Sequence, residues 1–125
     1  MTSHYIKCIV KSSFEAVFVA LNKAFSSICS KKIGTADQRV GVVLGERWFF
    51  RVNSDVAVLI ILEEFSTDKT KIEIISCAGG TGWFQISYNA HRAYAHNVIN
   101  FLKDSGFKIE SVKEISYFKQ RGNKP

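Results

Sequence analysis

Apolar residues follow two different spacings near the start of the chain. Over residues 5–10 they recur at every second position, with Ile6, Cys8 and Val10 on one side, which predicts a first strand. From Phe14 onwards they recur at every third or fourth position, which is typical of a helix that packs one face on a core. The helical stripe consists of Phe14, Val17, Phe18, Leu21, Phe25 and Ile28.

The ends of this first helix are also predicted from the sequence. Ser12 and Glu15 match a capping box, in which the serine side chain and the glutamate side chain each bond a free backbone N–H. Lys31 and Lys32 suit the negative end of the helix, and Gly34 supplies a left-handed stop. The helix is therefore expected to continue past Ile28.

The middle of the chain alternates β-rich runs with short turn signals, which predicts an antiparallel meander. Gly45-Glu46 fits a two-residue hairpin turn, because glycine suits its first central position. Asn53-Ser54-Asp55 and the segment 67–70 supply two further turns. The four predicted strands span 38–44, 47–52, 56–65 and 71–77.

The last third of the chain starts with a glycine-rich loop and continues as a second helix. Residues 83–88 are predicted as a short strand or an irregular lead-in, and Ser87 or Asn89 as the helix cap. Gly106 ends the helix, and residues 107–117 are predicted as a last strand or an extended arm. The apolar stripe of this helix is Ala90, Ala93, Tyr94, Val98, Phe101 and Leu102.

This order of elements predicts an α+β fold, with an antiparallel meander sheet and two helices packed on one face. The order β-α-β-β-β-β-(β)-α suits a helix-grip or TBP-like layout. Residues 1–118 are expected to form a single domain, and 119–125, with three bases and no acid, a basic flexible tail.

Composition and charge exclude several classes of protein. Hydrophobic residues make up 46% and charged residues 22%, the balance of a globular rather than a disordered chain. The longest apolar run, Val56–Leu62, is too short to span a bilayer. The net charge of +6 is spread over both halves of the chain, so nucleic-acid affinity is expected to be weak or absent. Cys8, Cys29 and Cys77 form no CxxC motif, which favours reduced thiols in the cytoplasm.

Few residues are candidates for chemistry. His91 and His96 lie five positions apart, about 140° around a helix, so they are not expected to share a metal ion. His4 is expected in a frayed end of the chain. Cys77 beside the glycine loop is the one thiol that a helical histidine could approach, but no spacing supports a nucleophile, and paired acid–base carboxylates are absent. We therefore expect no catalytic residue, no metal ion and no cofactor.

The glycine loop is the most unusual segment of the sequence. Its glycines allow backbone N–H groups to turn toward an anion, although the Lys-Ser/Thr ending of a phosphate loop is absent. A tight connection without a ligand is one interpretation, and a ligand-contacting loop with two aromatic walls is the other. The candidate ligand-binding residues are Gly79, Gly80, Thr81, Gly82, Trp83 and Phe84.

A family resemblance rests on the segment AGGTGWFQISYNAHRAYAHNVINFLKDSGF, residues 78–107. It resembles a glycine-rich stretch, roughly GGGxG followed by two apolar residues, Ile-Ser or Ile-Thr and an Ala-bearing helix. That stretch belongs to a family of small prokaryotic proteins with a domain of unknown function. Ala78 and Thr81 stand where that pattern has more glycine. The resemblance implies a prokaryotic fold unit and assigns no catalytic residue.

The predicted hairpin over 38–52 places apolar residues on both sides of the sheet. On one side Leu44 would lie opposite Arg47, and Val42 opposite Phe49. On the other side Gly41 would leave room for the ring of Phe50, which marks it as the helix-covered side. Because two helices cover one side only, the first side is predicted to be a homodimer interface. Its residues are Val40, Val42, Leu44, Arg47, Phe49 and Arg51.

Three hypotheses for function follow. The favoured one is a non-enzymatic binding or interaction module that forms a homodimer, with a small ligand as a second kind of partner. The second is a nucleic-acid binder that uses Arg39, Arg47, Arg51 and Phe49 as a basic, stacking platform. The sequence lacks the motifs of the RRM, KH and helix-turn-helix families, which counts against this second hypothesis. The third is an enzyme that acts on a small hydrophobic substrate.

Overall fold

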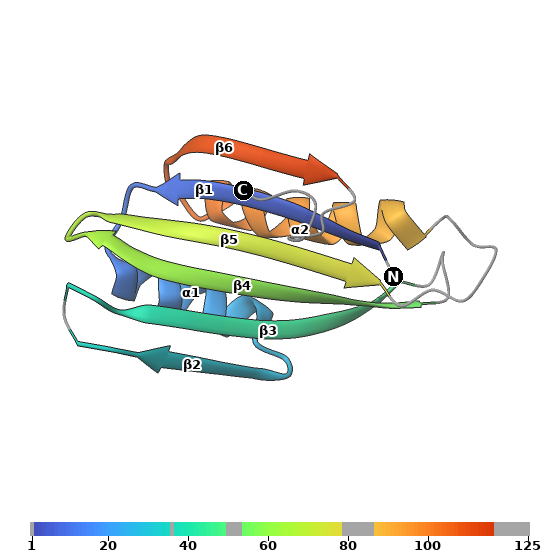
Figure 1. Cartoon of the computed structure of the whole chain (residues 1–125), viewed down its shortest axis with the longest axis horizontal. Coiled ribbons are helices and arrows are strands. Elements are labelled where there is room, and N and C mark those ends of the chain that lie inside the picture. Colours follow the sequence, from blue (N-terminus) through green and yellow to red (C-terminus); the bar gives the residue numbers. More distant parts are fainter. Residues whose placement is uncertain (1, 36, 50–53, 79–86, 117–125) are drawn as a thin grey trace.

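The computed structural model describes residues 2–35, 37–49, 54–78 and 87–116. They form a six-stranded antiparallel sheet with two helices packed against one face of it (Figure 1). The predicted α+β class is confirmed, whereas the helix-grip or TBP-like layout stays a prediction. Along the chain the elements are β1 Thr2–Val10, α1 Phe14–Phe25, β2 Cys29–Ile33, β3 Val40–Phe49, β4 Ser54–Ser66, β5 Lys69–Ala78, α2 Ser87–Asp104 and β6 Ile109–Ser116.

The strands are ordered β2-β3-β4-β5-β1-β6 across the sheet, so β2 and β6 form its two edges (Figure 1). The meander β2 to β5 follows the chain order, and β1 then pairs with both β5 and β6. The final segment, predicted as a strand or an arm, is thus a strand. Neither α1 nor α2, the helices of the described residues, is long and apolar enough to cross a membrane.

Helix α1 begins one residue later than the sequence predicts. Ser13 is the N-cap, and its hydroxyl accepts a hydrogen bond from the Ala16 N–H at 3.3 Å. The predicted capping box on Ser12 is therefore wrong. Glu15 lies in the first turn, where its charge suits the helix dipole, and its carboxylate contacts Lys32 and Arg39.

The helix also ends earlier than predicted, at Phe25, because the next residues begin a strand. The backbone N–H of Ile28 donates to the Leu44 carbonyl at 3.0 Å, which directs the chain along β3. Ile28 continues the apolar spacing of the helix in the sequence, but its side chain is half exposed. Lys31 and Lys32, predicted near the helix end, lie instead on the edge strand β2.

The predicted hairpin turn at Gly45-Glu46 is wrong, because both residues lie inside the single strand β3. Leu44 pairs with Leu59 of β4, and Arg47 and Phe49 continue β3 instead of lying opposite Leu44 and Val42. The described residues of the two predicted strands, 38–44 and 47–52, therefore lie on one strand from Val40 to Phe49. Its connection to β4 runs through 50–53, outside the described residues.

Two glycines of β3 let the first helix approach the sheet. A Cβ at Gly41 would lie 2.6 Å from the Phe18 ring, and a Cβ at Gly45 would overlap the carbonyl oxygen of Phe25. The prediction that Gly41 marks the helix-covered side is confirmed. The rings that it accommodates belong to Phe18 and Phe14.

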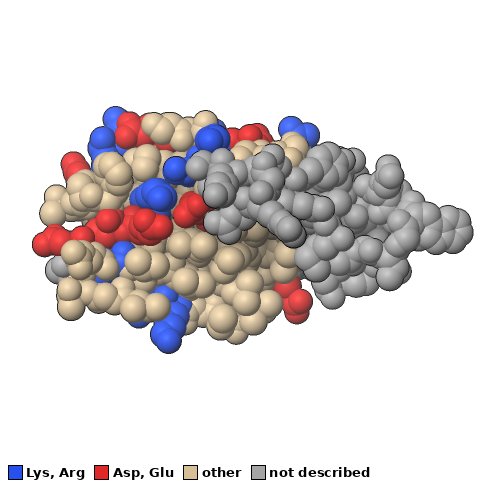
Figure 2. Space-filling view, viewed as in Figure 1, with Lys and Arg blue, Asp and Glu red and all other residues tan. Residues whose placement is uncertain are grey.

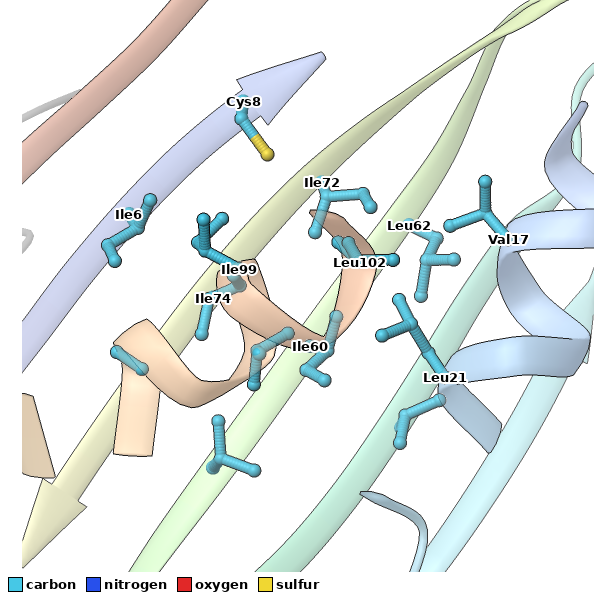
Figure 3. Packing of buried hydrophobic residues seen from close by; sticks show 14 of the residues in the cluster. Ile6, Cys8, Val17, Leu21, Ile60, Leu62, Ile72, Ile74, Ile99 and Leu102 are labelled. Carbon is cyan, nitrogen blue, oxygen red and sulfur yellow. The ribbon is translucent and has the colours of Figure 1, made fainter. Parts of the chain in front are cut away.

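The core lies between this side of the sheet and the two helices. Figure 3 shows aliphatic side chains from β1, β4 and β5 converging with those of both helices. Helix α2 contributes Tyr94, Ala95, Val98, Ile99 and Leu102. Of its predicted stripe, Ala93 is exposed and Phe101 is half-buried, while the side chain of Ala90 is outside the described part.

Candidate functional site

The side of the sheet that carries no helix, the helix-free face, is the first candidate site. Side chains alternate along each strand, so Val42 and Leu44 of β3 point away from the helices while Val43 is fully buried against them. Strand pairing places Val42 beside Ile61, and Leu44 beside Leu59. We call the half-buried or exposed residues of this face on β2 to β4 the apolar patch. Its apolar members include Ile33, Val40, Val42, Leu44, Leu59 and Ile61, and the exposed Lys31 of β2 lies beside Val42.

Charged side chains of both signs border the apolar patch. Lys71 of β5 lies 3.6 Å from Glu63 of β4, and the hydroxyl of Tyr5 donates to Glu73 at 2.5 Å. Burial and this hydrogen bond raise the pKa of Tyr5 well above its usual range. Figure 2 shows uncharged side chains gathered over β3 and β4, next to a band of acidic and basic ones. The face is therefore mixed in charge rather than basic.

Arg39, which the nucleic-acid hypothesis required, is engaged on the helix side of the sheet. Its guanidinium donates two hydrogen bonds to Glu64, at 3.0 and 2.9 Å, and lies over the ring of Phe14. The hydrogen bonds from Arg39 lower the pKa of Glu64 to about 2. The side chains of Arg47 and Phe49, and the whole of Arg51, lie outside the described residues.

A second candidate site brings together residues that are far apart in the sequence. Glu114 of β6 accepts hydrogen bonds from His4 of β1 and from His96 of α2, the latter at 2.6 Å between Nε2 and Oε2. Arg92 lies at the edge of the group, with its Nε 4.0 Å from the same oxygen. The prediction that His4 lies in a frayed end is wrong, because it is fully buried in β1.

The electrostatics of this cluster are set by burial and by the two imidazoles. Burial alone would raise the pKa of Glu114, but the hydrogen bonds and charges of His4 and His96 outweigh it and lower the pKa. The side chains of His96 and Glu114 are 40% and 32% exposed, so the cluster is open to solvent on one side. Two imidazoles and a carboxylate are also ligand types for a metal ion.

Cys77 does not face these histidines. It pairs with Ser3 of β1, whereas its neighbour Ser76 pairs with His4, so Cys77 and His4 point to opposite sides of the sheet. Burial raises the pKa of the Cys77 thiol. Burial also raises the pKa of Cys8, to about 12. Neither thiol is placed as an activated nucleophile.

The thiols should therefore differ in reactivity according to exposure. We expect Cys29, which is exposed on β2, to account for the fast phase when dilute protein reacts with a disulfide reagent near neutral pH. Cys29→Ser should remove that phase, and Cys77→Ser should leave it unchanged. A fast phase that survives in Cys29→Ser and disappears in Cys77→Ser would contradict this order.

The structure gives little support for a small-molecule pocket within the described residues. A pocket of about 210 Å³ opens between the end of α1, β3 and α2, lined by Ala24, Phe25, Ser27, Glu46 and Tyr94. It is smaller than the usual ligand pocket of about 300–1,000 Å³. The predicted ligand-binding loop, 79–84, lies outside the described residues, so that prediction stays open.

Comparisons of the chain with protein families, with curated proteins and with solved structures find no match. The resemblance of residues 78–107 to a prokaryotic family therefore stays a prediction.

Proposed function

We propose that the protein is a non-enzymatic interaction module that forms a homodimer through its helix-free face. The apolar patch carries this proposal. Both helices pack on the opposite side of the sheet, and Ile33 of the patch is 53% exposed. Monomeric proteins rarely leave a contiguous apolar surface of this kind to water.

A second copy is the partner that the charges favour. The border of the patch carries acids and bases side by side, with Glu63 next to Lys71 and Glu73 next to Tyr5 and opposite Lys7. In a symmetric dimer the same surface is used twice, so a border with both signs can meet its own complement. A nucleic acid would instead require a consistently positive surface. Arg39 does not supply one, since Glu64 and Glu15 bind it.

The test compares two substitutions that replace an exposed β-branched residue with glutamate on different sides of the molecule. Ile33 and Val19 are 53% and 55% exposed, on β2 and on α1 respectively. Ile33→Glu puts a charge into the apolar patch, whereas Val19→Glu puts the same charge on a helix. We expect sedimentation at high micromolar concentration to show a dimer for the wild type and for Val19→Glu. We expect a folded monomer for Ile33→Glu.

Circular dichroism of Ile33→Glu would establish that the fold is intact. A monomeric wild type, or an Ile33→Glu variant that still dimerises, would overturn the proposal. Loss of the dimer in Val19→Glu but not in Ile33→Glu would overturn it too, by placing the interface on the helix side.

A further inference from the structure

We propose that His4, His96 and Glu114 bind a divalent transition-metal ion of the Zn²⁺ type between β1, β6 and α2. This site is independent of the proposed dimer, because its residues lie on the helix side of the sheet, away from the apolar patch. The observation that carries the inference is the convergence of three ligand atoms from three separate elements.

The spacing of the ligand atoms suits a small ion. One nitrogen from each histidine and one oxygen of Glu114 all lie within 4.8 Å of one another. The closest described approach of His96 Nε2 to Glu114 Oε2 is 2.6 Å. Zinc–ligand bonds of about 2.0–2.2 Å require ligand atoms roughly 3.0–3.5 Å apart. Both nitrogen–oxygen contacts in the cluster are shorter than that value, so the partly exposed side chains of Glu114 and His96 would move apart to admit an ion.

The fold fixes the backbone of two ligands in paired strands, and the third reaches them from a helix. Glu114 pairs with Ile6, and His4 lies two residues before Ile6 on the same strand, so the two ligands are diagonal neighbours on one face of the sheet. His4 is fully buried, and its backbone lies between two paired strands. His96 reaches the pair from α2, and its side chain is 40% exposed. An ion can therefore enter from the solvent side.

The ligand set selects the class of metal. Two imidazole nitrogens and one carboxylate oxygen suit zinc and its first-row neighbours, whereas Mg²⁺ and Ca²⁺ prefer oxygen ligands throughout. Three protein ligands leave a coordination position for water, as in open zinc sites.

The competing interpretation is a metal-free network in which the imidazoles and Arg92 simply neutralise Glu114. In that case the hydrogen bonds already seen are the whole function of the cluster. Arg92 distinguishes the two interpretations, because its positive charge, 4.0 Å from the carboxylate oxygen, opposes a cation. Its side chain is 55% exposed and can turn away into solvent. Removing it should strengthen metal binding.

The experiment measures Zn²⁺ binding by calorimetry, with the full chain freed of metal and carrying Cys29→Ser and Cys77→Ser so that the more accessible thiols do not contribute. We expect one Zn²⁺ per chain, and a loss of affinity of about tenfold or more in His96→Ala and in Glu114→Gln. Glu110→Gln is the matched control, because this carboxylate lies on the same strand but binds Lys11 and Lys69. It should bind Zn²⁺ as the parent does, and Arg92→Ala should bind more tightly.

Circular dichroism of each variant shows whether it is folded, and His96 is exposed enough that its truncation should not unfold the chain. Co²⁺ provides a second readout, because an imidazole and carboxylate site gives a d–d absorption spectrum without a thiolate charge-transfer band. Failure of the thiol-substituted chain to bind Zn²⁺, or equal affinity in His96→Ala, Glu114→Gln and Glu110→Gln, would overturn the proposal. Neither result depends on whether the chain dimerises, so the two proposals can fail separately.

Discussion

Gly45→Ala is expected to destabilise the protein by about 3 kcal/mol or more, the upper end of the range for overpacking. The added Cβ would overlap the carbonyl oxygen of Phe25, where the chain leaves α1. A side chain could rotate away, but this oxygen belongs to the backbone at the end of a helix. Either β3 or the end of α1 must therefore move. Urea denaturation followed by circular dichroism measures the loss.

Gly106→Ala is the control for the cost of adding a methyl group to glycine. This glycine has a φ of +91° and no neighbouring atom within 4 Å of an added Cβ. Its substitution should cost only the backbone strain, about 1–2 kcal/mol. If Gly45→Ala and Gly106→Ala reduced stability equally, the close contact between position 45 and the Phe25 carbonyl would not be the cause of the loss.

Phe18→Ala is expected to cost about 3–5 kcal/mol, the usual range for a buried phenylalanine. The side chain is 5% exposed, and its ring stacks on Phe14 with 5.9 Å between the centroids. Glycine at position 41 means that no side chain of β3 can fill the space left by the ring. The cavity would therefore remain, and thermal or chemical denaturation should show the full loss.

Two further substitutions test whether burial sets this cost. Val19→Ala, at the next position of α1, should change stability by about 0.5 kcal/mol or less, because Val19 is 55% exposed. Phe101→Ala should cost less than Phe18→Ala, since Phe101 is only partly buried and packs edge-on against Phe25. A loss at Phe101 equal to that at Phe18 would contradict this ranking.

The helices could be predicted because their information is local. The stripe from Phe14 to Phe25 repeats with the helical period, and the structure buries Phe14, Val17, Phe18 and Leu21 on one side. The same holds for Tyr94, Val98 and Leu102 of α2. The buried face of an amphipathic helix can be predicted from the residues of the neighbouring turns alone.

The strands were predicted incorrectly where a residue that fits a local pattern is explained by a contact with a distant part of the chain. Gly45-Glu46 has the composition of a hairpin turn, but Gly45 is required by the carbonyl of Phe25, twenty positions earlier in the chain. Ile28 fits the helical stripe, yet its N–H pairs with Leu44. In both cases tertiary contacts outweighed the local preference.

One of the two candidate sites could be predicted in part from the sequence, and the other could not. Alternation along β3 correctly placed Val42 and Leu44 on the side without helices, because the period of a strand is local. The cluster of His4, His96 and Glu114 was missed, since its members come from the first strand, the last strand and the helix between β5 and β6. The spacing between His91 and His96 on one helix does not show that His96 lies beside residues of two distant strands.

The place of β1 in the sheet also determines when the fold can be completed during synthesis. Its two neighbours, β5 and β6, begin at Lys69 and Ile109, so the first strand made waits longest for its partners. The segments β3, β4 and β5 can pair as they emerge, because short connections link them. Until β6 arrives, one edge of β1 has free backbone groups open to another chain. Pairing with β6 is thus the step that removes this edge of β1 from contact with another chain.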